Sequence, residues 1–168
     1  MRYLIILILI AIGIGAYIYL SPKTLKKGDT IPPFELETAS GKFLDIEKYE
    51  GKALLIVFFS VDDDVSRDVF SDFHFISDQF KGDTDVRFIA IAVDGTPERL
   101  KLFLSQYRFP GDVLVDDGTF VAEVFQVTSF PMFYITNGER KIVYTIEGFA
   151  RNDIRELTPA LRRAKKED

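Results

Sequence analysis

The stretch A-L-L-I-V-F-F, from Ala53 to Phe59, decides how this chain folds. A continuous apolar run of this length is typical of a strand that is covered on both faces, as in the middle of an α/β sheet. A second such strand is predicted over 86–93. The segment between them predicts a helix over 64–80, because apolar residues recur there at helical spacing: Val65, Val69, Phe70, Phe73, Ile76 and Phe80.

The elements on either side complete an α/β domain. Upstream, alternation over 34–37, a turn at 40–42 and Phe43-Leu44 predict a hairpin, followed by one helical turn over 45–49. Downstream we expect a helix from Pro97 to Gln106 with Thr96 as its N-cap, a strand over 113–115 and a short helix over 119–125. Strands over 132–136 and 141–146 then flank Asn137-Gly138. A last helix is capped by Asn152 and interrupted by Pro159, which leaves its end open. The order predicts a mixed central sheet flanked by helices, with an N-terminal hairpin extension.

An uncharged run of 18 residues, Tyr3 to Leu20, precedes the domain. As a helix it would be about 27 Å long, close to the thickness of a bilayer core. It has no polar face, which argues against a helix of a soluble core. A cleaved signal peptide is the alternative, but no A-x-A site follows the run. We therefore predict a single transmembrane anchor over 1–20, a linker over 21–33 and one domain over 34–168.

Composition narrows the classes of function. The net charge is −5, and Arg2 is the only charge before residue 21, so the rest carries 20 Lys and Arg against 26 Asp and Glu, or −6. A domain this acidic lacks the basic surface of a nucleic-acid binder. One His, two Met and no Cys leave few ligands for soft metals, so we expect neither a cofactor nor a metal centre.

Several short motifs follow one another in a recognisable order. They are G-D-T-I-P-P-F-E-L at 28–36, G-K at 41–42, G-K-A-L-L-I-V-F-F at 51–59, A-V-D at 92–94, F-P at 109–110 with D-D-G at 116–118, and V-T-S-F-P-M-F-Y-I at 127–135. Together with the anchor they resemble the redoxin (AhpC/TSA) branch of the thioredoxin superfamily, and within it the TlpA/ResA-like membrane-anchored thiol–disulfide proteins. The resemblance covers about 28–161 and implies a thioredoxin fold.

The resemblance also locates a degenerate active site. The family carries W-C-x-x-C at the start of the helix after the first central strand, and here Asp63-Asp64-Val65-Ser66 occupies the C-x-x-C, with Asp63 and Ser66 at the cysteine positions. Thiol exchange needs a thiolate, which this chain does not possess. Val57 and Val69 stand where relatives carry proton-handling acids. The sequence therefore predicts no thiol–disulfide catalysis by the chain itself, and no catalytic residues.

The sequence still matches the part of the family motif that binds peptide. Pro131 matches its cis-proline, which lies beside the active-site turn and helps to hold extended peptide. The expected binding residues are Asp62, Asp64, Val65, Phe130 and Pro131. We expect an envelope protein or peptide as partner, with the domain outside the cytoplasm as the resemblance implies, since Arg2 against Lys23, Lys26 and Lys27 does not settle orientation. Whether Phe59, Phe130, Met132 and Phe133 form core or an apolar groove stays open at this point.

Two other hypotheses remain. The chain could serve a redox pathway, such as cytochrome c maturation or envelope redox homeostasis, through the thiols of a partner. Alternatively, Asp62-Asp63-Asp64 could bind a divalent cation through carboxylate oxygens. The simpler interpretation of this run is helix capping, with Asp64 as the expected cap.

Overall fold

The computed structural model describes residues 25–150 and 153–167. The elements are β1 (Glu35–Thr38), β2 (Phe43–Asp45), the 3-10 helix η1 (Ile46–Tyr49), β3 (Ala53–Phe59), α2 (Asp64–Ser77), the 3-10 helix η2 (Asp78–Phe80), β4 (Val86–Ala92), α3 (Pro97–Gln106), β5 (Asp112–Val115), α4 (Phe120–Phe125), β6 (Met132–Thr136), β7 (Ile142–Glu147) and α5 (Ile154–Ala164). The strands form one sheet in the order β2-β1-β5-β4-β3-β6-β7. Strands β3, β4 and β5 are parallel, whereas β6 runs antiparallel to β3. This is the expected mixed α/β sheet.

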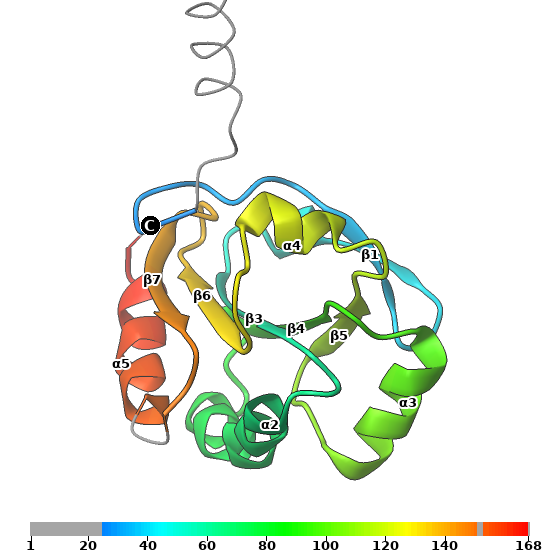
Figure 1. Cartoon of the computed structure of the whole chain (residues 1–168). Coiled ribbons are helices and arrows are strands. Elements are labelled where there is room, and N and C mark those ends of the chain that lie inside the picture. The colour runs from blue at the N-terminus through cyan, green and yellow to red at the C-terminus, as the bar shows by residue number, and fades with distance from the viewer. Residues whose placement is uncertain (1–24, 151–152, 168) are drawn as a thin grey trace, which may run out of the picture.

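Side chains of β3 alternate between two cores. Leu55, Val57 and Phe59 pack into one cluster with residues of α2, α3 and α5. Leu54, Ile56 and Phe58 pack into the other with η1, α4 and the N-terminal segment. The sheet therefore separates two helical layers, with α4 on the side opposite α2, α3 and α5 (Figure 1). Every residue of β3 is buried, as the continuous apolar run predicted.

The structure differs from the expected elements in a few places. The helix predicted over 64–80 ends at Ser77 and continues as η2. Val65 was expected on its apolar face but is 40% exposed, because the buried side of the first turn is formed by Ser66 instead. Helix α5 runs through Pro159 to Ala164.

Two expectations fall on parts of the chain without described coordinates. The predicted anchor over 1–20 and the predicted cap Asn152 both lie outside the described residues. Among the residues that are described, no helix is both long and apolar enough to cross a membrane.

The sheet topology brings two loops together at one edge. Parallel β3 and β4 end side by side, with Phe59 opposite Ala92, so the turns that follow them meet at their carboxyl ends. Antiparallel β6 begins at this same edge, where Met132 pairs with Phe58. The loop that precedes β6 therefore lies beside the turn that precedes α2, which is where the candidate site is formed.

Candidate functional site

A network of hydrogen bonds fixes the turn between β3 and α2. The Ser60 hydroxyl donates to Asp94 Oδ2 at 2.5 Å, and the Val61 amide donates to Asp94 Oδ1 at 3.2 Å. The Asp62 amide in turn donates to Ser60 Oγ at 3.1 Å. Asp94 follows β4, so the turn after one parallel strand is fastened to the turn after its neighbour.

Asp63 and Ser66, the positions that the resemblance matches to the cysteines, form a capping pair. Asp63 is the N-cap of α2, and its Oδ2 accepts from the Ser66 amide at 2.7 Å and from the Ser66 hydroxyl at 2.8 Å. Ser66 is fully buried. The expectation that Asp64 caps the helix was wrong, because Asp64 is already the first helical residue and its side chain points to solvent. The cysteine positions thus serve a structural purpose.

This arrangement makes a stability prediction that distinguishes neighbouring aspartates. Asp63→Ala should lower the free energy of unfolding by about 0.5–2 kcal/mol, the usual cost of losing an N-cap. The matched control Asp64→Ala removes only an exposed ion pair, so it should change stability by less than about 0.5 kcal/mol. Chemical denaturation followed by far-UV circular dichroism measures both. Equal losses in the two variants would contradict the assigned cap.

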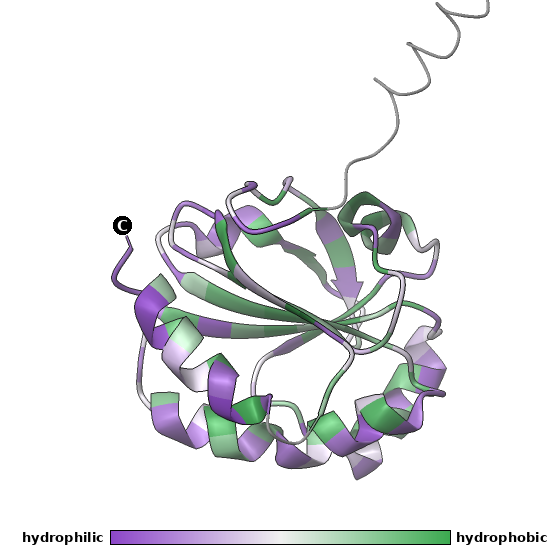
Figure 2. Ribbon diagram, turned by 60° about the vertical axis from the view of Figure 1, so that its left-hand side comes forward, coloured by the Kyte–Doolittle hydropathy of each residue, from purple (hydrophilic) through white to green (hydrophobic). Residues whose placement is uncertain are grey.

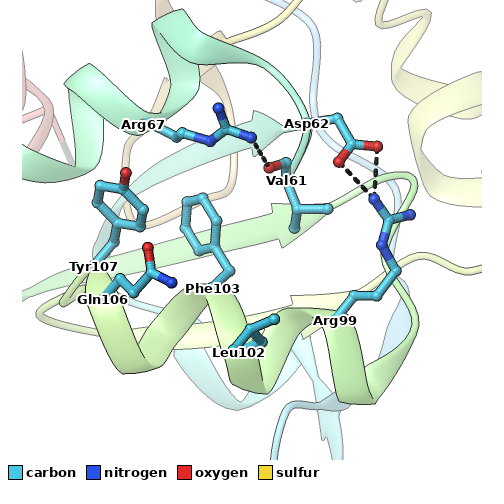
Figure 3. A pocket seen from close by; sticks show the side chains of 8 residues that line it. All are labelled: Val61, Asp62, Arg67, Arg99, Leu102, Phe103, Gln106 and Tyr107. Carbon is cyan, nitrogen blue, oxygen red and sulfur yellow. Dashed lines mark hydrogen bonds and ion pairs between the residues drawn. The ribbon is translucent and has the colours of Figure 1, made fainter.

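Asp62 links the turn to α3. One nitrogen of the Arg99 guanidinium, Nη2, donates to both carboxylate oxygens of Asp62 at 2.6 Å, and Nη1 donates to the Asp94 carbonyl at 3.1 Å. Figure 3 shows the pair bridging the turn and the helix. The hydrogen bond from Arg99 lowers the pKa of Asp62 below its usual value of 3.8, so this carboxylate is charged at neutral pH.

A second arginine holds the other side of the turn. Arg67 donates through Nη2 to the Val61 carbonyl at 3.2 Å and pairs through Nη1 with Asp64. A pocket of about 330 Å³ opens between the two arginines and α3. In Figure 3 it is bordered by the turn on one side and by Leu102, Gln106 and Tyr107 on the other. It combines apolar walls with one guanidinium–carboxylate pair, Asp62–Arg99, and with the guanidinium of Arg67.

The loop before β6 supplies the opposite part of the site. The Phe130–Pro131 peptide bond is cis, Pro131 is buried, and Phe130 is half-buried against the core beneath α4. Hydroxyls of Thr128 and Ser129 each donate to Glu147 on β7 at 3.1 Å, which holds the loop to the sheet. The register of β3 and β6 places this loop beside Ser60, as the sequence motif predicted.

The alternative left open for the aromatic residues is now decided. Phe59 and Phe133 are fully buried, and Met132 is 8% exposed, so all three belong to the core. Of the four candidates, Phe130 alone retains exposed surface near the turn. Of the two alternatives, the core therefore holds for Phe59, Met132 and Phe133, because the alternating strands direct their side chains into the two helical layers.

The aspartate run does not converge on one point. Asp62 faces Arg99, Asp63 faces Ser66, and Asp64 faces Arg67. Within the described ranges no three carboxylate or imidazole groups lie close enough to hold a metal ion. The geometry therefore disfavours the divalent-cation hypothesis, since such ions need several oxygen ligands around one centre.

Sequence reasoning missed the residues that hold the turn in place. Arg99 lies 37 residues from Asp62, and Arg67 was not among the expected site residues. Asp94 belongs to the A-V-D motif, so its position was noted, but its hydrogen bonds to Ser60 and Val61 were not predicted. The signal that could have found Arg99 is its place in the first turn of a helix that follows a parallel strand.

Comparison with known proteins now identifies the class. The AhpC/TSA family pattern matches residues 27–145, well over half of the 168-residue chain. The chain therefore belongs to the AhpC/TSA family, as its motifs indicated. The thiol-disulfide oxidoreductase ResA of Bacillus subtilis (strain 168) is 24% identical over 149 residues, covering 86% of this chain and 82% of that protein.

Solved structures show the same fold. A putative thiol:disulfide interchange protein DsbE from Chlorobium tepidum superposes with a TM-score of 0.77 at 20% identity, covering 84% of this chain and 99% of that one. A putative protein disulfide isomerase from Bacteroides thetaiotaomicron gives a TM-score of 0.77 at 18% identity, covering 85% and 92%. The domain is thus a thioredoxin-like redoxin domain related to thiol–disulfide oxidoreductases, in a chain without cysteine.

Proposed function

We propose that this protein is a non-catalytic redoxin, tethered to a membrane through residues 3–20, that binds an extended segment of another protein or peptide in the cell envelope. One observation carries the proposal: Asp63 and Ser66 occupy the cysteine positions and are hydrogen-bonded to each other. Exchange chemistry needs sulfur at these positions. The turn before α2 and the loop before β6 still lie next to each other, so a surface for a bound segment remains although the sulfur atoms are absent.

Two parts of that surface support peptide binding. The turn 61–65 and the loop around Phe130 lie side by side at the edge of the sheet. Phe130 exposes part of its ring there, and Leu102 is 66% exposed in the pocket beside the turn. Protein contacts usually depend on a few aromatic or apolar anchors of this kind.

Charge gives a second argument about the segment that binds. Asp62 and Asp64 are paired with Arg99 and Arg67, so these four side chains together carry no net charge. Salt bridges at exposed positions add little binding energy. We therefore expect the partner to be held mainly by apolar side chains and backbone hydrogen bonds, with weak dependence on salt.

The experiment uses the absence of native cysteine. A photoreactive benzophenone is attached to Asp64→Cys in the full chain, within the proposed binding surface, and to Phe75→Cys, an exposed position further along the same helix. Both labelled proteins are incubated with detergent-solubilised membranes from the cells of origin and irradiated. We expect a discrete cross-linked adduct from position 64, and its absence or a much weaker adduct from position 75.

A second substitution tests the anchor residue. Phe130→Ala in the position-64 background should reduce adduct yield more than tenfold, which corresponds to about 1.4 kcal/mol of binding. Because Phe130 also packs against the core, thermal melts must show that the variant is folded at the temperature of irradiation. Equal yield from positions 64 and 75, or no loss on Phe130→Ala, would show that the domain binds through another face.

A further inference from the structure

The outer side of α4 is apolar although it faces solvent. Phe120 is 71% exposed and Val124 is 36% exposed. Together with Pro33 and Phe34 they border a hollow of about 360 Å³ whose lining residues are all apolar. Figure 2 shows α4, at the top of the domain, in the green of hydrophobic residues along most of its length. We call these four residues the α4 patch.

Helix α4 carries apolar residues on both of its sides. Its inner residues Val121, Ala122 and Phe125 are buried in the core. Its outer residues are Phe120 and Val124 of the α4 patch and the exposed Glu123, which is the one charged residue of the helix. A surface helix normally places polar residues on the solvent side. An exposed apolar patch next to an apolar hollow usually marks a surface that contacts a partner or a membrane.

The chain enters the domain on this same layer. Leu25, the first described residue, packs against the core cluster that contains Val121 and Phe125. The N-terminal segment then crosses the top of the domain and passes α4 before entering β1 (Figure 1). Helices α2, α3 and α5 lie on the opposite side of the sheet.

The length of the connection limits how far this layer can lie from the membrane. Only residues 21–24 separate the uncharged run, which ends at Leu20, from Leu25. Five residue steps span at most about 17 Å even when fully extended. A domain of this size is roughly 35–40 Å across, from its expected radius of gyration. If residues 3–20 span the bilayer, the layer of Leu25 and α4 is held near the lipid surface.

We propose that the α4 patch docks into the interfacial region of the lipid bilayer. This inference rests on the membrane tether of the proposed function. Phe120 and Val124 would enter the boundary between headgroups and acyl chains, while the exposed Lys26 and Lys27 would lie among the headgroups. Because the chain outside the run is acidic, apolar contact rather than attraction to anionic lipid drives the docking, and zwitterionic lipid suffices.

The test uses single-cysteine variants of the full chain reconstituted into phosphatidylcholine vesicles. An environment-sensitive nitrobenzoxadiazole probe is attached to Val124→Cys in the patch and to Phe75→Cys on α2, which is 59% exposed in the opposite layer. Brominated acyl chains should quench the probe at position 124 at least fivefold more than the probe at 75. Aqueous iodide should show the reverse order. Phe120→Asp in the position-124 background should abolish the difference, whereas Phe75→Asp there should not.

The outcomes separate the proposal from the tether. If the chain does not float with the vesicles after alkaline carbonate treatment, the tether fails and the docking fails with it. If it floats but iodide reaches position 124 as freely as position 75, the tether stands and the docking is wrong. Shielding from iodide without quenching by brominated lipid means that another protein molecule covers the α4 patch, which also overturns the proposal.

Discussion

The double variant Asp63→Cys/Ser66→Cys is expected to convert the hydrogen-bonded Asp63–Ser66 pair into a reversible dithiol–disulfide pair. Asp63 caps α2 and Ser66 lies one turn later, with their side chains already in contact at 2.8 Å. Helical geometry places such Cα atoms about 5 Å apart, within the range that a disulfide accepts. The positive end of the helix should also lower the pKa of the first thiol.

The measurement is thiol titration of the oxidised and reduced forms, with insulin reduction as the functional assay. The unsubstituted chain should stay at the level of the blank, because it contains no cysteine. The single variants Asp63→Cys and Ser66→Cys are the controls, since neither can close an intramolecular disulfide. A folded double variant that keeps both thiols free under oxidant would show that the turn no longer has the geometry of its relatives.

Asp116→Ala is expected to give the largest loss of stability, about 2–4 kcal/mol, because it leaves two buried amides without an acceptor. Asp116 is 1% exposed. Its Oδ1 accepts from the Val121 amide at 3.2 Å and its Oδ2 from the Ala122 amide at 2.7 Å. These are donors of the first turn of α4, which would otherwise stay unpaired in the core.

Asp116→Asn is the matched control. It keeps one carbonyl oxygen as acceptor and the same shape, so it should lose less than half as much stability as the alanine variant. Urea denaturation of the full chain in detergent, followed by far-UV circular dichroism, compares the midpoints at equal slopes. The alanine variant also removes the cost of burying a polar carboxyl group. A loss of stability below about 0.5 kcal/mol for Asp116→Ala would show that this gain offsets the two lost hydrogen bonds, and would contradict the prediction.

Helix α4 has a second attachment that should limit the damage. The Tyr134 hydroxyl donates to the Phe125 carbonyl at 2.9 Å, and burial raises the pKa of Tyr134 to about 12. The phenol therefore remains a hydrogen-bond donor over the physiological pH range. We expect Asp116→Ala to loosen the start of α4, with Phe120, more than its end. The same variant should consequently weaken the proposed docking of the α4 patch.

Much of the fold was predictable because its signals are local or depend on one property along the chain. The runs at 53–59 and 88–93 are apolar enough that only burial on both faces accommodates them. Thr96 before Pro97 marks the start of α3 by capping chemistry alone, and the Thr96 hydroxyl accepts from the Arg99 amide as expected. The motif around Pro131 located the loop beside the turn.

Other features could not be predicted because they depend on which segments meet. The Asn137-Gly138 signal correctly placed the hairpin between β6 and β7, but Arg140 rather than Gly138 adopts the positive φ. Asn137 there accepts from the Lys141 amide and donates to the Glu167 carbonyl near the C-terminus. A contact across 30 residues thus helps to shape a turn that local sequence rules treat alone.

By itself, then, the sequence determined the α/β class and the order of the elements, because apolar periodicity and capping act along the chain. It also determined the loss of thiol chemistry, because a missing sulfur needs no structure to be recognised. Only the tertiary structure decided that Asp63 caps α2, that Arg99 pairs with Asp62, and that the outer side of α4 is apolar and exposed. The physical reason is that pairing and exposure depend on neighbours contributed by distant segments, which the packing of two layers on one sheet brings together.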